Sequence, residues 1–249
     1  MKLVLSEPRL LIEPISVISE LVNEVQFKID KDRLELISMD PANVAMIVFT
    51  MMSSAFSEYD VKKPVTISLG LDSFKAVLRR SKPSDAITLQ LDEDKNRLKI
   101  QIVGESTRTF NLSLIDIEEK KQRVPDLTFP LKIQTNSSVF DEAITDMDIV
   151  SESVMLVCDK DKFCVEASGN LSDAKAEIGK DENTVIDCKS KEEVRSKYSI
   201  EYLKKMVKAG KLSPNLEIQF SKDYPLRMDY RIKDKLGLSF ILAPRVSND

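Results

Sequence analysis

The chain has 249 residues, of which 42% are hydrophobic and 31% charged, and its net charge is −4. This composition is typical of a soluble globular protein with one large or two smaller domains. It excludes a surface uniformly positive for nucleic acid but permits a local basic surface. The longest apolar run, near Val44–Phe49, is too short to span a bilayer, and Glu7 and Pro8 interrupt the N-terminus, which is no convincing signal peptide.

The first half of the chain predicts a helix at about Pro8–Glu24, followed by short alternating strands. The predicted strands are Val25–Ile29, Leu34–Ser38, Val44–Met51, Ile87–Leu91, Leu98–Val103 and Thr107–Leu114. Between the two groups of strands, Leu71–Lys82 predicts a second helix with two different faces. The apolar face comprises Leu71, Phe74, Val77 and Leu78, and the basic face comprises Lys75, Arg79 and Lys82.

The second half repeats the first at a shift of 129 residues, which drops to 128 after a one-residue deletion in a hairpin loop. The apolar face recurs as Ile200, Leu203, Met206 and Val207, and the basic face recurs as Lys204, Lys208 and Lys211. An early helix is predicted at about Ser137–Val150. The strands are predicted at Val154–Cys158, Phe163–Ala167, Asp173–Ile178, Leu216–Phe220, Leu226–Ile232 and Leu238–Leu242. We interpret this pattern as an internal duplication.

In each copy another strand is expected just before the basic helix. The order of elements predicts an α+β fold, with two helices and antiparallel sheets in each copy. Between the copies, Ile115–Lys132 is charged and contains Pro125 and Pro130, so it is predicted to be an extended linker. The predicted domains are therefore residues 1–114 and 133–249, joined by a linker at 115–132. One basic helix alone is most simply a solvated surface. Its recurrence in register indicates that both copies need positive charge at the same place.

The motifs of common catalytic sites are absent from the sequence. There is no histidine and no glycine-rich phosphate loop. The acidic runs Asp92–Asp94 and Glu118–Glu119 are predicted to be solvated surface. Cys158 and Cys164 are predicted to be small buried hydrophobes, and with Cys188 they lack paired ligand spacing, which suggests a reducing cytosol. We expect no catalytic residue, metal site or cofactor.

Several short strings carry a resemblance to a known family: SMDPANVAMI (Ser38–Ile47), PLRMDYRI (Pro225–Ile232) and FILAPRV (Phe240–Val246). With the duplication, the basic helices and the linker, they make the whole chain similar to the sliding clamps of DNA replication. The nearest group is the proliferating-cell nuclear antigen family in an archaeal-looking version. The resemblance implies a ring of three two-domain subunits around duplex DNA. It also implies docking of DNA polymerase, flap endonuclease, DNA ligase and clamp loader on one face, in the cytoplasm of an archaeon or the nucleus of a eukaryote.

On this resemblance the basic helices line the hole of the ring. The expected DNA-facing residues are Lys75, Arg79, Arg80, Lys82, Lys204, Lys205, Lys208 and Lys211. Lysine and arginine give sequence-independent attraction to phosphates, which suits a protein that slides. The early helices depart from the family pattern. The first carries Arg9 but also Glu13, Glu20 and Glu24, and its repeat carries four acidic residues and no basic one.

Free sheet edges are expected to close the ring by head-to-tail pairing between subunits. We expect Thr107–Leu114 and Asp173–Ile178 to be edge strands. The predicted interface residues are Phe110, Leu112, Ala174, Lys175 and Ile178.

A peptide-binding groove for partners is predicted from a difference between the copies. The outward positions Val44, Met46 and Val48 are apolar, whereas their equivalents in the second copy are charged. Cover by the linker alone is one explanation, and a groove walled by the linker is the other. The resemblance favours the groove and implies that it is lined by Met39, Val44, Met46, Val124, Pro225, Ala243, Pro244 and Arg245.

The leading interpretation is a non-enzymatic DNA sliding clamp. One alternative is a single subunit of a clamp built from three different chains, suggested by the acidic early helices. Another, from a different class, is a metal-dependent hydrolase that uses clustered carboxylates, although the sequence offers no convergent set.

Overall fold

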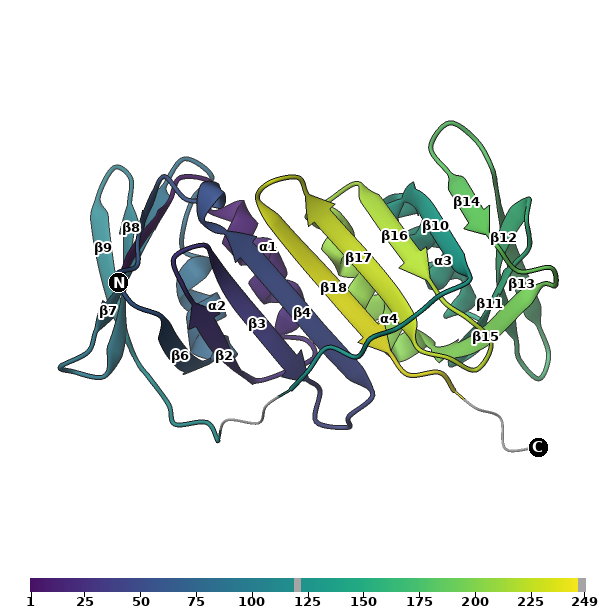
Figure 1. Ribbon diagram of the computed structural model, residues 1–249, viewed down its shortest axis with the longest axis horizontal. Coiled ribbons are helices and arrows are strands. Elements are labelled where there is room, and N and C mark those ends of the chain that lie inside the picture. Colours follow the sequence, from purple (N-terminus) through teal and green to yellow (C-terminus); the bar gives the residue numbers. More distant parts are fainter. Residues whose placement is uncertain (119–121, 246–249) are drawn as a thin grey trace. The chain divides into compact units, whose positions relative to one another are not determined.

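A computed structural model of the chain describes residues 1–118 and 122–245. Residues 119–121 of the predicted linker and 246–249 of the predicted C-terminal domain lie outside the described residues. The chain forms two compact units. Unit 1 comprises Met1–Pro41, Ile47–Val124 and Ile232–Leu238, and unit 2 comprises Ala42–Met46, Pro125–Arg231 and Ser239–Asp249. Each unit contains antiparallel strands and two α-helices, as the α+β prediction required (Figure 1).

Unit 1 contains two groups of strands. One group has the order β5-β1-β7-β8-β9 and the other the order β6-β2-β3-β4. The first group consists of β1 (Lys2–Leu5), β5 (Glu58–Asp60), β7 (Ala86–Asp92), β8 (Arg97–Val103) and β9 (Thr107–Ser113). The second consists of β2 (Glu24–Ile29), β3 (Arg33–Met39), β4 (Ala45–Met52) and β6 (Val65–Gly70). The helices are α1 (Arg9–Ile18), α2 (Leu71–Leu78) and the short 3-10 turn η1 (Ser53–Ala55).

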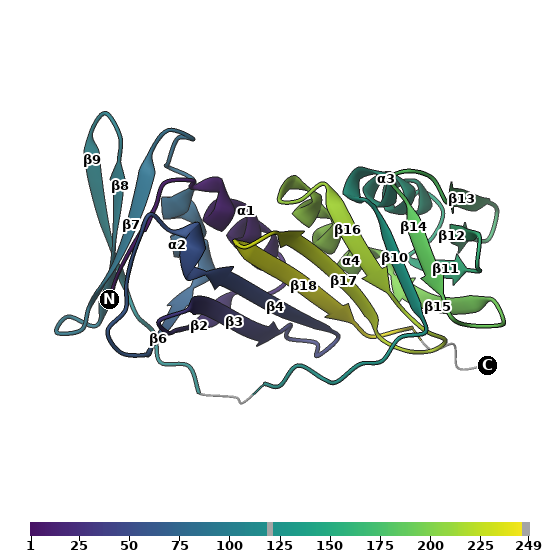
Figure 2. The same ribbon diagram turned by 45° about the horizontal axis from the view of Figure 1, so that its top comes forward.

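Unit 2 repeats this plan with strand orders β14-β10-β16-β17-β18 and β13-β12-β11-β15. Strands are named here with the unit that holds most of their residues, although one end of β4, β17 and β18 is assigned to the other unit. The first group consists of β10 (Leu131–Asn136), β14 (Val185–Cys188), β16 (Asn215–Gln219), β17 (Leu226–Ile232) and β18 (Leu236–Leu242). The second consists of β11 (Ser153–Cys158), β12 (Lys162–Ser168), β13 (Asp173–Gly179) and β15 (Val194–Ser199). Its helices are α3 (Ser137–Met147), α4 (Ile200–Met206) and the 3-10 continuation η2 (Val207–Lys211), near the strands β10 and β16 (Figure 2).

The duplication is visible in individual turns as well as in element order. In the turn between β2 and β3, the carboxylate of Asp30 accepts hydrogen bonds from the backbone N–H groups of Asp32 and Arg33 at 2.8 and 3.0 Å. In the equivalent turn of unit 2, Asp159 accepts the same two bonds, both at 2.8 Å. These bonds lower the pKa of both carboxyl groups, because they favour the ionised form. One turn design therefore serves both copies.

The apolar faces predicted for the basic helices form part of the core. All four apolar residues of α2 are buried, and so are Ile200, Leu203 and Met206 of α4 and Val207 at the start of η2. Burial of such a stripe holds a short helix that would be marginal alone. The basic run Val207–Lys211 is a 3-10 turn rather than the predicted α-helix, and it still places Lys208 and Lys211 at the surface.

The early helices end before their predicted boundaries. The predicted helix Pro8–Glu24 ends at Ile18, because the N–H groups of Glu20 and Leu21 bond carbonyls three residues back, at Val17 and Ile18. This tighter pattern is typical of a terminating helix. The repeat, predicted to reach Val150, ends at Met147 with the same pattern at Ile149 and Val150.

Four strands were missed in the sequence, namely β1, β5, β10 and β14. Each has at most six residues, so its alternation is a weak signal. β10 also overlaps the predicted linker, because Leu131 and Lys132 already pair with β14.

No helix in the described ranges 1–118 and 122–245 is long and apolar enough to cross a membrane.

Candidate nucleic-acid interface

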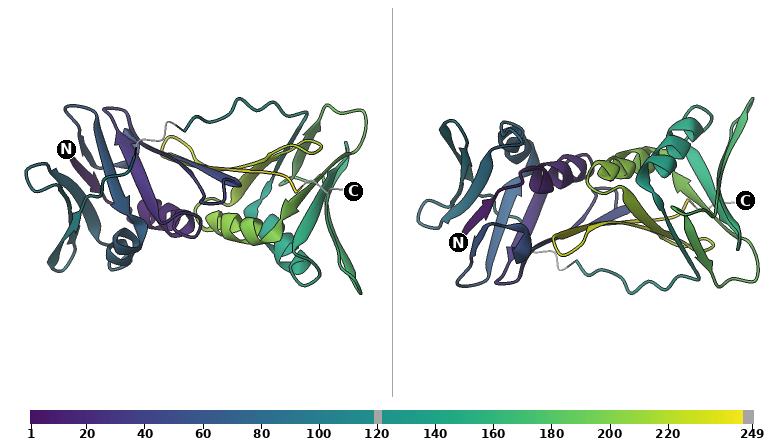
Figure 3. Two further views of the ribbon diagram at one scale, coloured as in Figure 1. Left: turned by 90° about the horizontal axis from the view of Figure 1, so that it is seen from below. Right: turned by 90° about the horizontal axis from the view of Figure 1, so that it is seen from above.

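Each unit carries a pair of helices in mutual contact. In unit 1, α1 contacts α2, and α2 also contacts β6 and β9, which belong to different strand groups. In unit 2, α3 contacts α4 and η2, together with β10 of one strand group and β11 to β13 of the other. The two helices of each unit lie side by side in both views of Figure 3. Each helix pair therefore presents one continuous surface made of two helices.

The predicted basic residues on these helix pairs all reach the surface. Arg79, Arg80, Lys82, Lys204, Lys208 and Lys211 are exposed or partly exposed, while Lys75 and Lys205 are half-buried. The first-copy residues thus lie on α2 and the residues that follow it, and the second-copy residues lie on α4 and η2. A role in binding DNA stays a prediction, but the side chains are placed where an anion could reach them.

Several of these cations have partners within the chain. Lys75 Nζ donates a hydrogen bond of 2.8 Å to Ser19 Oγ. Lys204 Nζ forms an ion pair of 2.6 Å with Asp148. Lys205 pairs with Glu201 at 2.9 Å and lies over the Tyr202 ring.

Other cations of the set are less engaged. Lys82 pairs at 3.4 Å with Glu105, an exposed residue. The side chains of Arg79, Arg80 and Lys211 have no ion-pair partner within the described part of the chain. Exposed ion pairs such as Lys82–Glu105 and Lys204–Asp148 are weak and are screened by salt, so a phosphate could compete for these lysines.

A buried carboxylate fixes the loop that follows α2. Asp85 is 3% exposed and accepts a hydrogen bond of 2.9 Å from the backbone N–H of Lys82. Arg108 on β9 donates to Asp85 at 2.6 Å and, with its other terminal nitrogen, to the carbonyl of Arg80 at 2.7 Å. This arginine clamps the basic loop onto β9. Sequence reasoning did not single out Asp85 or Arg108, because nothing in their spacing reveals the contact.

The early helix of unit 2 has an acidic outer face. Asp141, Glu142, Asp146 and Asp148 are all exposed. α3 has no basic residue in its last turn and no acidic residue in its first. The departure from the family pattern noted in the sequence is therefore a surface feature of the folded unit.

The two predicted edge strands are confirmed as edges. β9 is the last strand of its group in unit 1, and β13 is the last strand of its group in unit 2. Phe110, Leu112 and Ala174 are half-buried and Lys175 is exposed. Ile178 is only 7% exposed, because it belongs to the inward set of β13. Its side chain is therefore a core residue of unit 2, and only its backbone is available at the edge.

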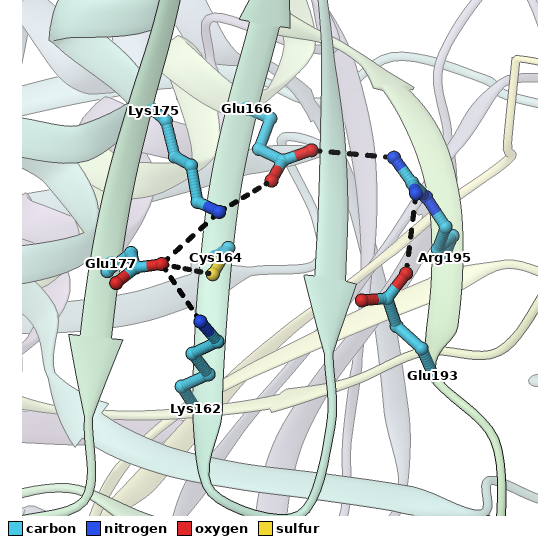
Figure 4. A network of polar contacts seen from close by, with 7 residues as sticks. All are labelled: Lys162, Cys164, Glu166, Lys175, Glu177, Glu193 and Arg195. Carbon is cyan, nitrogen blue, oxygen red and sulfur yellow. Dashed lines mark hydrogen bonds and ion pairs between the residues drawn. The ribbon is translucent and has the colours of Figure 1, made fainter.

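The outer face of β13 and its neighbours carries a charge network (Figure 4). Glu177 lies between Lys162 and Lys175, at 3.1 and 3.2 Å, and Lys175 also reaches Glu166 at 3.3 Å. The bond from Lys162, together with that from Lys175, lowers the pKa of Glu177. Cys164 lies beneath this network, 3% exposed, and burial raises its pKa. It is thus a buried thiol, as predicted.

Cys158, on the neighbouring strand, is fully buried, and burial raises its pKa to about 12. Both features make it a poor nucleophile. No group of three or more Cys, Asp or Glu residues in the described ranges could hold a metal ion.

The predicted groove residues are mostly accessible, with one exception. Met39, Val44, Pro225, Ala243 and Pro244 are half-buried, and Val124 and Arg245 are exposed. Met46 is only 7% exposed, although alternation placed it on the outer face. Within unit 2, the backbone N–H of Ala243 donates to the carbonyl of Val44 at 2.9 Å, and that of Arg245 donates to the carbonyl of Lys197 at 2.7 Å. These bonds hold Ala243 beside Val44 and Arg245 beside β15.

Comparison with known proteins agrees with this architecture. Residues 2–123 match the family described as proliferating cell nuclear antigen, N-terminal domain, and residues 123–245 match its C-terminal domain. The chain is 37% identical over 232 residues to the DNA polymerase sliding clamp of Thermococcus gammatolerans, with 93% of each chain covered. It is 35% identical over 228 residues to that of Pyrococcus furiosus, covering 92% of this chain and 91% of the relative.

The fold has a match among solved structures. The crystal structure of PCNA from Thermococcus kodakaraensis superposes with a TM-score of 0.92 at 23% identity, covering 98% of this chain and 99% of that one. The duplicated α+β units, with a positive helix face in each, define a clamp-type binding protein. The chain belongs to the proliferating cell nuclear antigen family.

Proposed function

We propose that this protein is a DNA sliding clamp, which encircles duplex DNA and tethers replication and repair enzymes to it. The observation that carries the proposal is the recurrence of a positive helix face in both units, at equivalent positions. Family membership supports the same function and gives no support to a metal-dependent hydrolase. The archaeal origin of the relatives supports a cytoplasmic, nucleoid-associated location.

The chemistry of the basic faces fits a protein that must hold DNA and still move along it. Lysine and arginine attract phosphates without reading base edges, so the attraction is the same at every step along the duplex. The net charge of −4 leaves the rest of the surface unattractive to DNA. The helix pairs would therefore be the preferred place of contact.

Alanine at the six residues of the two basic stripes tests this assignment. The variant carries Lys75, Arg79, Lys82, Lys204, Lys208 and Lys211 all changed to alanine. Exposed substitutions usually change stability by less than ~0.5 kcal/mol each, so the fold should persist. DNA association, measured by anisotropy across a salt series, should weaken, and its logarithmic salt slope should fall by about 0.9 for each phosphate that the variant no longer neutralises.

A control variant separates this local effect from net charge. It changes six loop lysines to alanine: Lys31, Lys62, Lys95, Lys160, Lys222 and Lys233. Because the net charge changes equally, any non-specific effect should appear in both variants. An unchanged salt slope in the first variant, or an equal change in both, would contradict the assignment of the helix faces.

We further propose that copies of the chain join through the edges β9 and β13 into a ring of three. Both edges carry unpaired backbone groups along one side, which favours strand addition by another chain. Phe110, Leu112 and Ala174 offer partly uncovered apolar surface on these strands. Beside β13, Leu171 is 100% exposed and Ile149 is 84% exposed.

These two apolar side chains come from adjoining segments. A Cβ placed on Gly169 would lie 2.5 Å from the carbonyl oxygen of Val150, so the β12–β13 turn packs directly against the end of α3. Large apolar side chains left so open need a cover. A second copy is the occupant we propose, because the patch is continuous with the edge strand that the ring requires.

The partner enzymes are proposed to dock through a short peptide with apolar and aromatic anchors. The residues proposed for it are those that the resemblance implies, Met39, Val44, Val124, Pro225, Ala243, Pro244 and Arg245. Met46 is 7% exposed and offers little contact surface. The flexible thioether of Met39 suits a surface that must fit several partners. DNA polymerase, flap endonuclease, DNA ligase and clamp loader are the partners proposed.

A further inference from the structure

The two units hold equivalent lysines in unequal ways. Lys75 in α2 and Lys204 in α4 are equivalent in the duplication, and so are their partners Ser19 and Asp148. Ser19 and Asp148 are the C-cap residues of α1 and α3, respectively. Lys75 Nζ therefore meets a neutral hydroxyl at 2.8 Å, whereas Lys204 Nζ meets a carboxylate at 2.6 Å. The same position in the fold carries a net charge in unit 1 and an ion pair in unit 2.

The carboxylate of Asp148 is not explained by the stability of its helix. A negative charge at the C-terminal end of a helix opposes the helix dipole. Asp146 adds another negative charge in the same turn and forms a like-charge pair with Glu142, four residues earlier. In unit 1 a serine completes the same contact, with its hydroxyl also donating to the carbonyl of Ser16 at 2.9 Å. A neutral C-cap is therefore compatible with this fold.

We propose that Asp148 is a built-in competitor of DNA phosphate for Lys204, so that unit 2 holds DNA more weakly than unit 1. The inference rests on the proposed function, since it takes Lys75 and Lys204 as phosphate contacts. The side chains of Lys204 and Asp148 are 47% and 40% exposed, so the pair is accessible to a phosphate and to salt. A phosphate must compete with Asp148 for the charge of Lys204, whereas the contact described for Lys75 is with the neutral hydroxyl of Ser19.

The consequence is that the two units of every subunit attract DNA with unequal strength. Among the described residues, the stripe of Lys75, Arg79 and Lys82 forms one ion pair, between Lys82 and the exposed Glu105 at 3.4 Å. Lys204 is neutralised at close range, and the exposed carboxylates of α3 lie on the adjoining helix. Asp148 thereby lowers the total affinity and concentrates it on unit 1. Weak, one-sided contact suits a ring that must slide.

The duplication supplies its own test variants. Asp148→Ser copies the unit 1 contact into unit 2, and Ser19→Asp copies the unit 2 contact into unit 1. Full-length protein is titrated with duplex DNA by anisotropy across a salt series. Asp148→Ser should raise the affinity severalfold at low salt and steepen the logarithmic salt slope by about 0.9 for each lysine released. Ser19→Asp should lower the affinity and make the slope shallower by a similar amount.

Three controls keep the result specific. Asp161→Ser makes the same change in net charge at a turn residue that is 94% exposed, and it should leave the affinity unchanged. In a Lys204→Met background Asp148→Ser should have no effect, and in a Lys75→Met background Ser19→Asp should have none. Unchanged binding in either swap, or an effect that persists without its lysine, would overturn the proposal. Absence of wild-type binding, in contrast, would count against the proposed function itself.

Discussion

At the scale of single residues, the helical period predicts which side chains reach the surface, but it does not predict which residues those side chains contact. The apolar stripe of α2 is buried and Arg79 and Lys82 reach the surface, because a spacing of 3.6 residues fixes the face of a helix. The pair between Lys204 and Asp148 depends on where α3 ends, three residues before its predicted limit. Helix ends are set by local hydrogen bonds that spacing does not encode, so this contact could be found only in the structure.

Met46 illustrates a second residue-scale limit. Strand alternation assigned it to the outer face of β4, yet its side chain is 7% exposed. Alternation states which face a side chain takes, whereas exposure depends on what covers that face. A charge at Met46 would therefore be buried and could unfold the protein, so it is an unsuitable probe of the partner surface.

Val124 is the better probe, since its side chain is 38% exposed. We predict that Val124→Glu weakens binding of a peptide with apolar and aromatic anchors by at least about 1 kcal/mol, the usual threshold for an important contact. The cause is the replacement of apolar contact surface by a solvated charge. Calorimetric titration of such a peptide measures the change in affinity.

The matched control is Val185→Glu on β14, where valine is 55% exposed and outside the proposed surface. This variant should bind the peptide with wild-type affinity, and both variants should bind DNA normally. Wild-type affinity in Val124→Glu would show that the peptide docks elsewhere.

At the scale of elements, the duplication gave the sequence most of its predictive power. Each weak strand in one copy was supported by its equivalent in the other, and the paired turns at Asp30 and Asp159 show how closely the copies agree. A strand missed in one copy was also missed in the other, as β1 was with β10 and β5 with β14. β1 has four residues and β5 has three, too few for alternation to be distinguished from loop.

The edge strands make an element-scale prediction about assembly. Leu171→Asp and Ile149→Asp should each weaken self-association, because they place a charge in a contact proposed to be apolar. Since both side chains are open in the single chain, the fold should be unaffected. Sedimentation velocity should show a smaller species at a given concentration than for the wild type, with unchanged circular dichroism.

Met52→Asp, at an apolar residue 39% exposed near the end of β4, is the control and should leave the oligomer intact. Wild-type sedimentation in both test variants would place the contact between copies elsewhere. The wild-type mass is also informative. A trimer of the purified chain indicates identical subunits, while a monomer indicates that different chains complete the ring.

At the scale of the whole molecule, charge is distributed by element rather than spread evenly. An acidic chain carries basic faces on α2 and on α4 with η2, and an acidic face on α3. Composition alone excluded a uniformly basic surface, and periodicity located the basic faces. Ring assembly could be suggested only by combining edge strands with the family resemblance, because no feature of one chain fixes the number of copies.

We propose that the protein holds DNA by encircling it. The direct measurement compares retention on nicked circular duplex with retention after the same circles are linearised, following incubation with a clamp loader and ATP. Encirclement predicts that the protein stays on circular DNA through gel filtration at moderate salt. It should be lost once the circle is cut, because the cut creates free ends over which the ring can slide off. Equal retention on circular and linear DNA would contradict it, since ordinary surface binding does not depend on the presence of ends.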